Sequence, residues 1–446
     1  MTRHIASVLV AFLLAAPAAP YAQTQMSDNV VVLEHADSLL GKVIEGENVR
    51  ELIGNVRFRQ GTVAVTCDRA MQYLRSNRAS LDGNVSVRDD TLTMRGKRGM
   101  YYGAERAAEA FESVRLDDGT TVLTAGYGKY YVAEKRAYFR DTVTVRDSVS
   151  TLTCRELTYS RDQKRSVADG DVRIRSSQEN LTIFGQHLED DKKSGFSRMT
   201  IRPRVEQIDT STVGRTDTMV VLSRIMELHQ DTVRRMIAID SVRMWRSELA
   251  ATSGLAFFYT NLDSIILRID PVVWYEDDQV SGDSIFIKLK ERRPQTVYVR
   301  GSAFAISISD TLHPSRFNQM TGETITMRFA ENKIQRIEVD QTATSLYYLY
   351  ETVEDSTGKR LEPNGVNKTT GDHVIVEFVD GKSNKIRVIG GVEGQYFPEN
   401  LADGREAEYS LGGFNWREDR PGAWRRAVPA GRSSPTQTLE KRTSHE

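Results

Sequence analysis

The chain has 446 residues, and its 60 lysine and arginine residues against 61 aspartate and glutamate residues leave a formal charge of −1. A chain this neutral lacks the basic balance that phosphate backbones require, so we expect no nucleic-acid partner. The content of 39% hydrophobic and 8% aromatic residues suffices for a core, though a lean one. Two cysteines, Cys67 and Cys154, exclude a disulfide-dense scaffold and a metal site built from cysteines alone.

The first 25 residues have the pattern of a secretory signal peptide. Arg3 and His4 precede an apolar stretch over residues 5–14, and a group of small residues follows with cleavage sites after Ala18 or Ala22. The apolar stretch is too short to span a bilayer comfortably. Residues 1–25 are therefore predicted to be removed on export to an oxidising compartment, and an uncleaved anchor is the less favoured alternative.

The next feature in chain order is an internal repeat. Five segments of similar sequence follow one another at a spacing of 29 residues, and they begin at Gly54, Gly83, Glu112, Asp141 and Gly170. Other positions keep the same spacing: Ala79, Ala108, Ala137 and Ser166 align, as do Leu81, Ala110, Phe139 and Ala168, and Tyr101, Tyr130 and Tyr159. A fixed period of this length is the signature of a repeat architecture, in which each unit buries its apolar face against the next.

Within each unit the apolar residues alternate with polar ones. Val85 and Val87 share one face of an extended chain, and Ser86 and Arg88 take the other, which is strand periodicity. Turn residues recur at matched places, at Gln60-Gly61, Asp89-Asp90 and Asp118-Gly119. Stacked units of this kind predict an elongated, two-sheeted β-structure.

The second half continues the pattern in looser form. Further strands are expected over residues 296–307, 323–329, 334–339, 374–379 and 386–389. Residues 209–218 resemble an insertion or domain junction, and residues 355–371 are expected to form a long polar loop. The proline-rich, mildly basic end of the chain is predicted to be disordered.

The residues offer little support for catalysis. The acidic pairs Asp89-Asp90 and Asp117-Asp118 recur where the repeat turns, which is typical of turn capping, whereas a catalytic constellation does not repeat. The seven histidines are scattered without metal-ligand spacing. We therefore expect no enzyme activity, no metal site and no cofactor, and a carbohydrate-active β-solenoid enzyme is the weakest alternative.

The spacing of the two cysteines provides a test of the predicted stacking of the repeat units. They are 87 residues apart, three repeat lengths, so they occupy the same position in their units. Units stacked at about 4.8 Å per strand place them at least ~14 Å apart, beyond the ~7 Å between Cα atoms that a disulfide allows. Free, inward-facing thiols are predicted.

The repeat resembles the OstA-like family, which is related to the lipopolysaccharide-transport protein LptA and to the N-terminal domain of LptD. The resemblance rests on the segments of the type Gly83-Asn84-Val85, on the alanine-containing strand before each, and on Val280 to Ile285 after Pro271. It covers roughly residues 28–340. It implies an open, V-shaped β-jellyroll with two consecutive modules, residues 28–200 and 201–400. Residues 401–446 are assigned to the disordered tail that the composition from Arg417 onward predicts.

The resemblance also implies a function. It suggests a periplasmic protein, possible association with the outer membrane, lipopolysaccharide as cargo, and end-to-end strand pairing with other jellyroll components or with a second copy of the chain. The candidate lipid-lining residues are Val56, Phe58, Val85, Val87, Val114, Leu116, Val143, Val145, Val172 and Ile174. The alternative is an exported repeat scaffold in which the same residues fill a closed core.

Overall fold

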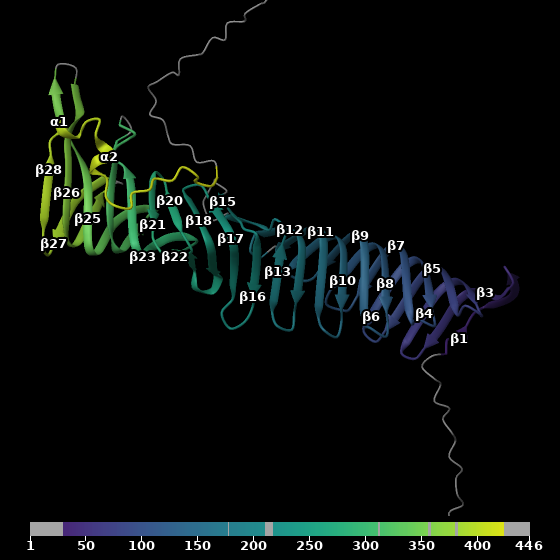
Figure 1. Ribbon diagram of the computed structural model, residues 1–446. Helices are drawn as coiled ribbons and strands as arrows, with labels where there is room; N and C mark the ends of the chain where they lie inside the picture. Colours follow the sequence, from purple (N-terminus) through teal and green to yellow (C-terminus); the bar gives the residue numbers. More distant parts are fainter. Residues whose placement is uncertain are drawn as a thin grey trace, which may run out of the picture.

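The computed structural model describes residues 30–176, 178–209, 217–310, 313–355, 358–379 and 382–422. Within these residues, 28 strands form one sheet, accompanied by two short α-helices and one 3₁₀ turn. Figure 1 shows an elongated molecule with the first strands at one end and the last strands at the other. The predicted all-β fold of stacked strands is confirmed; the predicted signal peptide lies outside the described residues.

The N-terminal part is an antiparallel meander. From β3 to β12, each strand pairs with the strand before it and the strand after it, so one repeat unit contributes two strands. The strands are β1 (Val32–His35), β2 (Ser38–Ile44), β3 (Glu47–Gln60), β4 (Val63–Tyr73), β5 (Arg78–Asp89), β6 (Leu92–Tyr102), β7 (Ala107–Asp117), β8 (Val122–Tyr131), β9 (Arg136–Arg146), β10 (Ser150–Ser160), β11 (Arg165–Ser176) and β12 (Leu181–Asp191).

In the middle of the molecule, several of the bent strands are divided into two shorter ones. For example, β12 pairs with β13 along one half and with β14 along the other. These strands are β13 (Phe196–Thr200), β14 (Arg204–Asp209), β15 (Asp217–Leu222), β16 (Ile225–His229), β17 (Arg235–Trp245), β18 (Leu249–Tyr259), β19 (Ser264–Arg268), β20 (Val272–Tyr275), β21 (Asp278–Ser281) and β22 (Ser284–Lys290), with the 3₁₀ turn η1 (Thr260–Leu262). Strand pairing continues across residue 200, and the division into two modules stays a prediction. Residues 210–216 of the expected junction lie outside the described residues.

The C-terminal part ends in long strands and a short helical corner. Its elements are β23 (Arg293–Ile308), β24 (Phe317–Ala330), β25 (Lys333–Asp355), β26 (Gly358–Val379), β27 (Lys382–Ile389), β28 (Glu393–Phe397), α1 (Glu399–Ala402) and α2 (Glu406–Tyr409). The expected strands in this part are confirmed but longer. The expected polar loop over residues 355–371 is wrong, because β26 pairs with β25 through this segment, from Gly358 opposite Asp355 to Gly371 opposite Ala343.

The predicted disordered tail also needs correction. Residues 399–422, here called the strap, form the two helices and an extended segment that runs back over the outer face of the sheet. Of the predicted tail, residues 423–446 lie outside the described residues. The strap packs on Phe304 and Leu346, and its backbone is held by Trp274 and Gln279. The two hydrogen-bond donors, Trp274 and Gln279, lie more than a hundred positions earlier in the chain, and composition does not reveal such distant partners.

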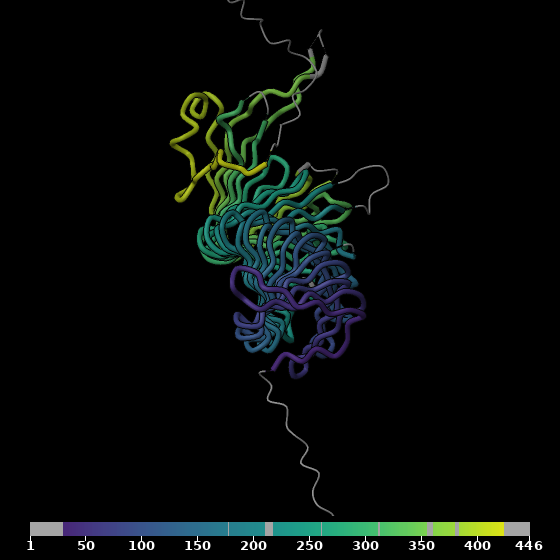
Figure 2. The backbone as a smooth tube through the Cα atoms, turned by 90° about the vertical axis from the view of Figure 1, so that its right-hand side faces the viewer, coloured from purple at the N-terminus to yellow at the C-terminus, as the bar shows by residue number. Residues whose placement is uncertain are grey.

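The interior lies between two layers formed by the bent strands. Figure 2, which looks along the length of the molecule, shows the strands bent into a narrow roll. One apolar cluster runs through this interior from Leu52 to Val376. Cys67 and Cys154 are both buried in it and free, as predicted. Burial raises the pKa of each thiol to about 12.

Candidate functional site

Each strand bends at the residues with which its repeat unit begins. Gly54-Asn55, Gly83-Asn84 and Gly170-Asp171 are consecutive residues with positive φ, as are the equivalent residues of the two units between them. The pair stands opposite a single residue of the next strand, where the register shifts. Such a bulge turns the strand, and the apolar residues on both sides of it face the same interior. Sequence alignment found these positions but placed them at the start of a strand rather than at its corner.

The two halves of the strands carry two ladders of paired apolar residues. The first ladder contains Phe58, Val65, Val87, Met94, Leu116, Leu123, Val145, Leu152, Ile174, Ile183, Val205, Val221 and Met244, each opposite the next. The second contains Leu52, Ala70, Leu81, Gly99, Ala110, Gly128, Phe139, Leu157, Ala168, Leu188, Met199, Met226 and Ala238. Both continue toward the C-terminal end. Together they make an apolar interior that extends along the molecule.

The ten predicted lining residues all lie in this interior. Phe58, Val87, Leu116, Val145 and Ile174 belong to the first ladder, and the other five lie directly after the corners. Eight of the ten are between 0 and 6% exposed, whereas Val145 and Ile174 are only partly buried. The second ladder was not predicted as lining. The signal was present, because Leu81, Ala110, Phe139 and Ala168 keep the 29-residue spacing.

Hydrogen bonds join the two layers along the line where the rows of hairpin turns face each other, here called the mouth. The Tyr101 hydroxyl donates to Gln60 Oε1 at 2.6 Å, and the Tyr130 hydroxyl donates to Asp89 Oδ2 at 2.9 Å. Both tyrosines are 2–3% exposed. In each pair the partners are 41 residues apart, so these two tyrosines of the 29-residue spacing join the two layers.

Farther along the mouth, the contacts are ionic. Arg161 Nη2 lies 3.0 Å from Asp90 Oδ2, and Arg234 Nη1 lies 3.3 Å from Glu179 Oε1. Lys192 acts on Asp118 and Asp147: burial would raise the pKa of these carboxyls, but backbone N–H groups and this lysine hold it below the usual value. In these contacts the first row of turns provides the acids and the facing row provides the bases.

The acidic residues at the hairpin turns, which were weighed as candidates for catalysis, have a structural role. Asp118 Oδ1 accepts hydrogen bonds from the backbone N–H groups of Thr120 and Thr121, and Asp147 Oδ1 from those of Val149 and Ser150. They cap turns, as the repeat predicts. Burial raises the pKa of another acid, Asp278, to about 7, but Asp278 begins β21 directly after a turn that carries Glu276 and Asp277. Among the described residues, no cluster of three or more histidine, cysteine or acidic side chains could hold a metal ion.

The packing of the interior varies along its length. Between the layers near Leu249, Val273 and Phe329 there is a cavity of about 10 Å³, room for about one water molecule. In the central section, β9 to β15, several inward residues are only partly buried. These residues are Val145, Leu152, Ile174, Leu181, Ile183 and Met219. The central section is therefore the least tightly closed part of the paired ladders.

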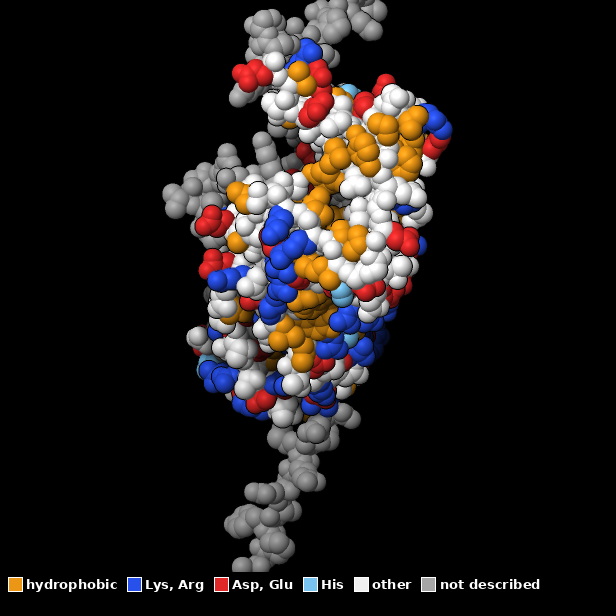
Figure 3. Space-filling view, turned by 90° about the vertical axis from the view of Figure 1, so that its left-hand side faces the viewer, with side chains coloured by type: hydrophobic (Ala, Val, Ile, Leu, Met, Phe, Trp, Pro, Cys, Tyr) orange, Lys and Arg blue, Asp and Glu red, His pale blue; other side chains and the backbone are white. Residues whose placement is uncertain are grey.

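Each end of the molecule presents an edge that no described strand covers. At the N-terminal end, β1 and β2 pair only with β3; at the C-terminal end, β27 and β28 pair only with β26. Leu40 and Val43 are 48 and 70% exposed at the first edge, and Ile386 and Ile389 are 40 and 49% exposed at the last. Figure 3, viewed from the C-terminal end, shows a stripe of hydrophobic side chains bordered by lysine and arginine. No helix of the described residues is long and apolar enough to span a membrane.

Comparison with known proteins finds one family that matches the part of the chain that carries the repeat. Residues 28–183 match the family described as OstA-like protein, which confirms the resemblance for this part of the chain, whereas residues 184–340 were expected to share it and are not matched. One similar solved structure is LptH of Pseudomonas aeruginosa, described as the LptA-homologous periplasmic component of the lipopolysaccharide transport device. It is 14% identical, with a TM-score of 0.25, over 34% of this chain and 95% of that one. No curated protein matches.

Proposed function

We propose that this chain is a non-enzymatic, lipid-binding bridge of the periplasm that carries lipopolysaccharide toward the outer membrane. The observation that carries the proposal is the pair of apolar ladders, which run without interruption from β3 through the central section. Acyl chains that cross an aqueous space need such a path, because each exposed methylene costs about 0.8 kcal/mol. The OstA-like match of residues 28–183 supports the same assignment.

The ends of the molecule support a bridging role. A bent strand with an uncovered edge and exposed apolar side chains is suited to pair with a strand of another jellyroll component or of a second copy. Strand pairing at both ends would continue the two ladders from one molecule into the next. Periplasmic location follows from the predicted signal peptide and from this proposed role.

Photo-crosslinking tests the lipid cargo. A crosslinking amino acid at Val145, which faces the interior, is expected to capture lipopolysaccharide at least about tenfold more than one at Arg88, since burial of two methylene groups already exceeds 1.4 kcal/mol. A crosslinker at Val87 probes the tightly packed section. Equal capture at Val145 and Arg88, or capture at neither, contradicts the proposal.

A structural scaffold without cargo is the second candidate, and one observation favours it. Eight of the ten candidate lining residues are at most 6% exposed, and buried tyrosines close the mouth above the first units. A fully packed interior leaves no space for acyl chains. Native mass spectrometry of protein purified from its own membrane fraction separates the two: co-purified lipid contradicts the scaffold.

A further inference from the structure

The ionic contacts across the mouth hold the two layers less firmly than the buried hydrogen bonds nearer the N-terminus do. Tyr101 and Tyr130 make buried hydrogen bonds, and a buried polar group that loses its partner costs about 1–3 kcal/mol. The ion pairs are more exposed, with 43 and 37% exposure for the side chains of Arg234 and Glu179 and 25 and 71% for those of Arg161 and Asp90. Pairs of this kind contribute about 0–1 kcal/mol each. The layers are therefore easier to separate over the central section than over the first units.

The central section is also the part of the interior that is best suited to admit acyl chains. Beneath the ion pairs lie inward side chains that are only partly buried, among them Ile174 and Ile183, which are paired with each other. In the closed section before it, Ala110 pairs with Gly99 and Gly128 on the neighbouring strands, and Val85 lies against the place of the missing Cβ of Gly99, so no space is left there. Chains inserted between the layers would meet least resistance in the central section.

The contacts across the mouth join acids of one row to bases of the other. The acids Asp90, Asp118, Asp147 and Glu179 lie on the first row of turns, and the bases Arg161, Lys192 and Arg234 lie on the second, which also carries Asp162 and Asp231. If the rows separate, these three bases lose their carboxylate partners across the mouth and lie beside an apolar opening. That combination is complementary to a molecule with an anionic head group and apolar chains.

We propose that the mouth over β9 to β15 is a lateral entrance for an anionic amphiphile, in which Arg161, Lys192 and Arg234 exchange their carboxylate partners for the head group while the acyl chains pass between the ladders. This inference rests on the proposed function and adds where the ligand enters and which residues receive it. The ligand enters from the side of the molecule rather than by threading from one end.

The test is to lock the mouth. In a Glu179→Cys/Arg234→Cys variant, a short bismaleimide joins the two rows, and capture of lipopolysaccharide micelles is measured by a photo-crosslinker at Ile174. Cys67 and Cys154 do not interfere, because burial raises their pKa to about 12 and leaves no thiolate at neutral pH. The matched control is Lys135→Cys/Asp162→Cys, an ion pair of 3.2 Å whose partners both lie on the second row.

Locking the mouth is expected to lower capture at Ile174 by about tenfold or more, whereas the control bridge leaves it within about twofold. Unchanged capture with the mouth locked overturns the lateral entrance and leaves the proposed function standing. No capture at Ile174 in the unbridged variant contradicts the proposed function itself. Asp90→Cys/Arg161→Cys provides a second lock if the first pair perturbs folding, which circular dichroism will show.

The head-group site has a separate readout. Dodecyl phosphate and dodecyl maltoside carry the same chain but differ in head-group charge. Arg234→Gln is expected to lower capture of dodecyl phosphate about ten- to hundredfold, the effect of one charge-assisted hydrogen bond, and to leave dodecyl maltoside unchanged. Competition by inorganic phosphate alone would show that the cations bind phosphate without the chain. Equal losses for both amphiphiles, or full competition by phosphate, overturns the head-group role.

Discussion

At the scale of single residues, the corner of each repeat unit decides the shape of the protein. Gly83 has a φ of +72°, and Asn84 follows it with a φ of +48°. The Asn84 side chain donates to Asp68 Oδ2 at 2.8 Å, and Gly54, Asn55 and Asp37 repeat the arrangement one unit earlier. Glycine is required here for two reasons, the left-handed backbone and the carboxylate that occupies the place of its missing Cβ.

Substitution of this glycine has a predictable cost. Gly83→Ala is expected to lower the free energy of unfolding by about 2 kcal/mol, because the left-handed backbone and the overlap with Asp68 both penalise a Cβ. Gly119→Ala is the matched control: Gly119 also has a positive φ, but no atom lies near its missing Cβ, so about 1 kcal/mol is expected. Urea denaturation measures both. Equal losses would show that contact with Asp68 does not matter.

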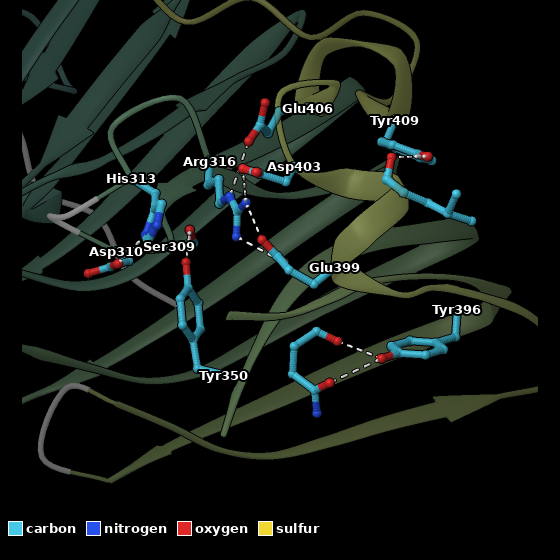
Figure 4. A network of polar contacts seen from close by, with 12 residues as sticks. Ser309, Asp310, His313, Arg316, Tyr350, Tyr396, Glu399, Asp403, Glu406 and Tyr409 are labelled. Carbon is cyan, nitrogen blue, oxygen red and sulfur yellow. Dashed lines mark hydrogen bonds and ion pairs between the residues drawn. The ribbon is translucent and has the colours of Figure 1, made fainter. Parts of the chain in front are cut away.

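At the scale of elements, the strap is the feature that separates the C-terminal half from the first units. It covers apolar side chains on the outer face of β17 to β26, among them Trp274 and Phe304, that the N-terminal strands do not carry. Figure 4 shows how its helical corner is fixed: Arg316 donates to Glu399, Asp403 and Glu406. The Arg316 side chain is only 1% exposed.

This buried arginine should matter more than its surface neighbours. Arg316→Gln is expected to cost about 1.5–3 kcal/mol, because charge-assisted hydrogen bonds to the strap are lost. Arg405→Gln breaks an exposed ion pair with Glu408 on the same corner and is expected to leave the free energy of unfolding nearly unchanged, because solvent screens the pair. Thermal unfolding followed by tryptophan fluorescence compares the two. A loss of similar size in both variants would contradict a structural role for the buried network.

At the scale of the whole molecule, the two uncovered ends determine how it can assemble. Among the described residues, every inner strand pairs on both sides along at least part of its length, and the edges at the two ends of the sheet, where a further strand can be added, are β1–β2 and β27–β28. The second apolar ladder reaches both edges, at Leu39 and at Val388, whereas the first continues through Ser345, Thr369 and Gly394 toward the C-terminal edge. Assembly at the ends would therefore extend the interior, whereas assembly along the sides would not.

Charge placed on an edge tests this mode of assembly. Leu40→Lys/Val43→Lys puts two cations on the uncovered N-terminal strand and is expected to abolish concentration-dependent association in sedimentation velocity, because buried, unpaired charges oppose strand pairing. Val149→Lys, on a hairpin turn away from the ends and 41% exposed, is the control and should associate as the unmodified chain does. Association that persists in the double variant, or is lost equally in the control, contradicts end-to-end pairing.

The sequence by itself determined the local features that recur from one repeat unit to the next. Alternation within a strand decides which side chains share a face, so Val87 and Val145 were assigned correctly to the interior, and the 29-residue period placed the turns at Asp89 and Asp118. The same arithmetic predicted free thiols at Cys67 and Cys154. These features depend on near neighbours and on a constant spacing, which are both visible in one dimension.

Only the tertiary structure decided how the layers meet. The bend at Gly83-Asn84 folds each strand back on itself, and it thereby brings Gln60 to Tyr101 and Glu179 to Arg234. The strap was likewise missed, because its partners lie more than a hundred residues earlier. The alternation of apolar and polar residues determines which face of a strand a side chain occupies. It does not determine the angle between the two halves of a bent strand. Whether the interior is closed or can be entered is therefore set by side chains that are distant in sequence and meet only at the mouth.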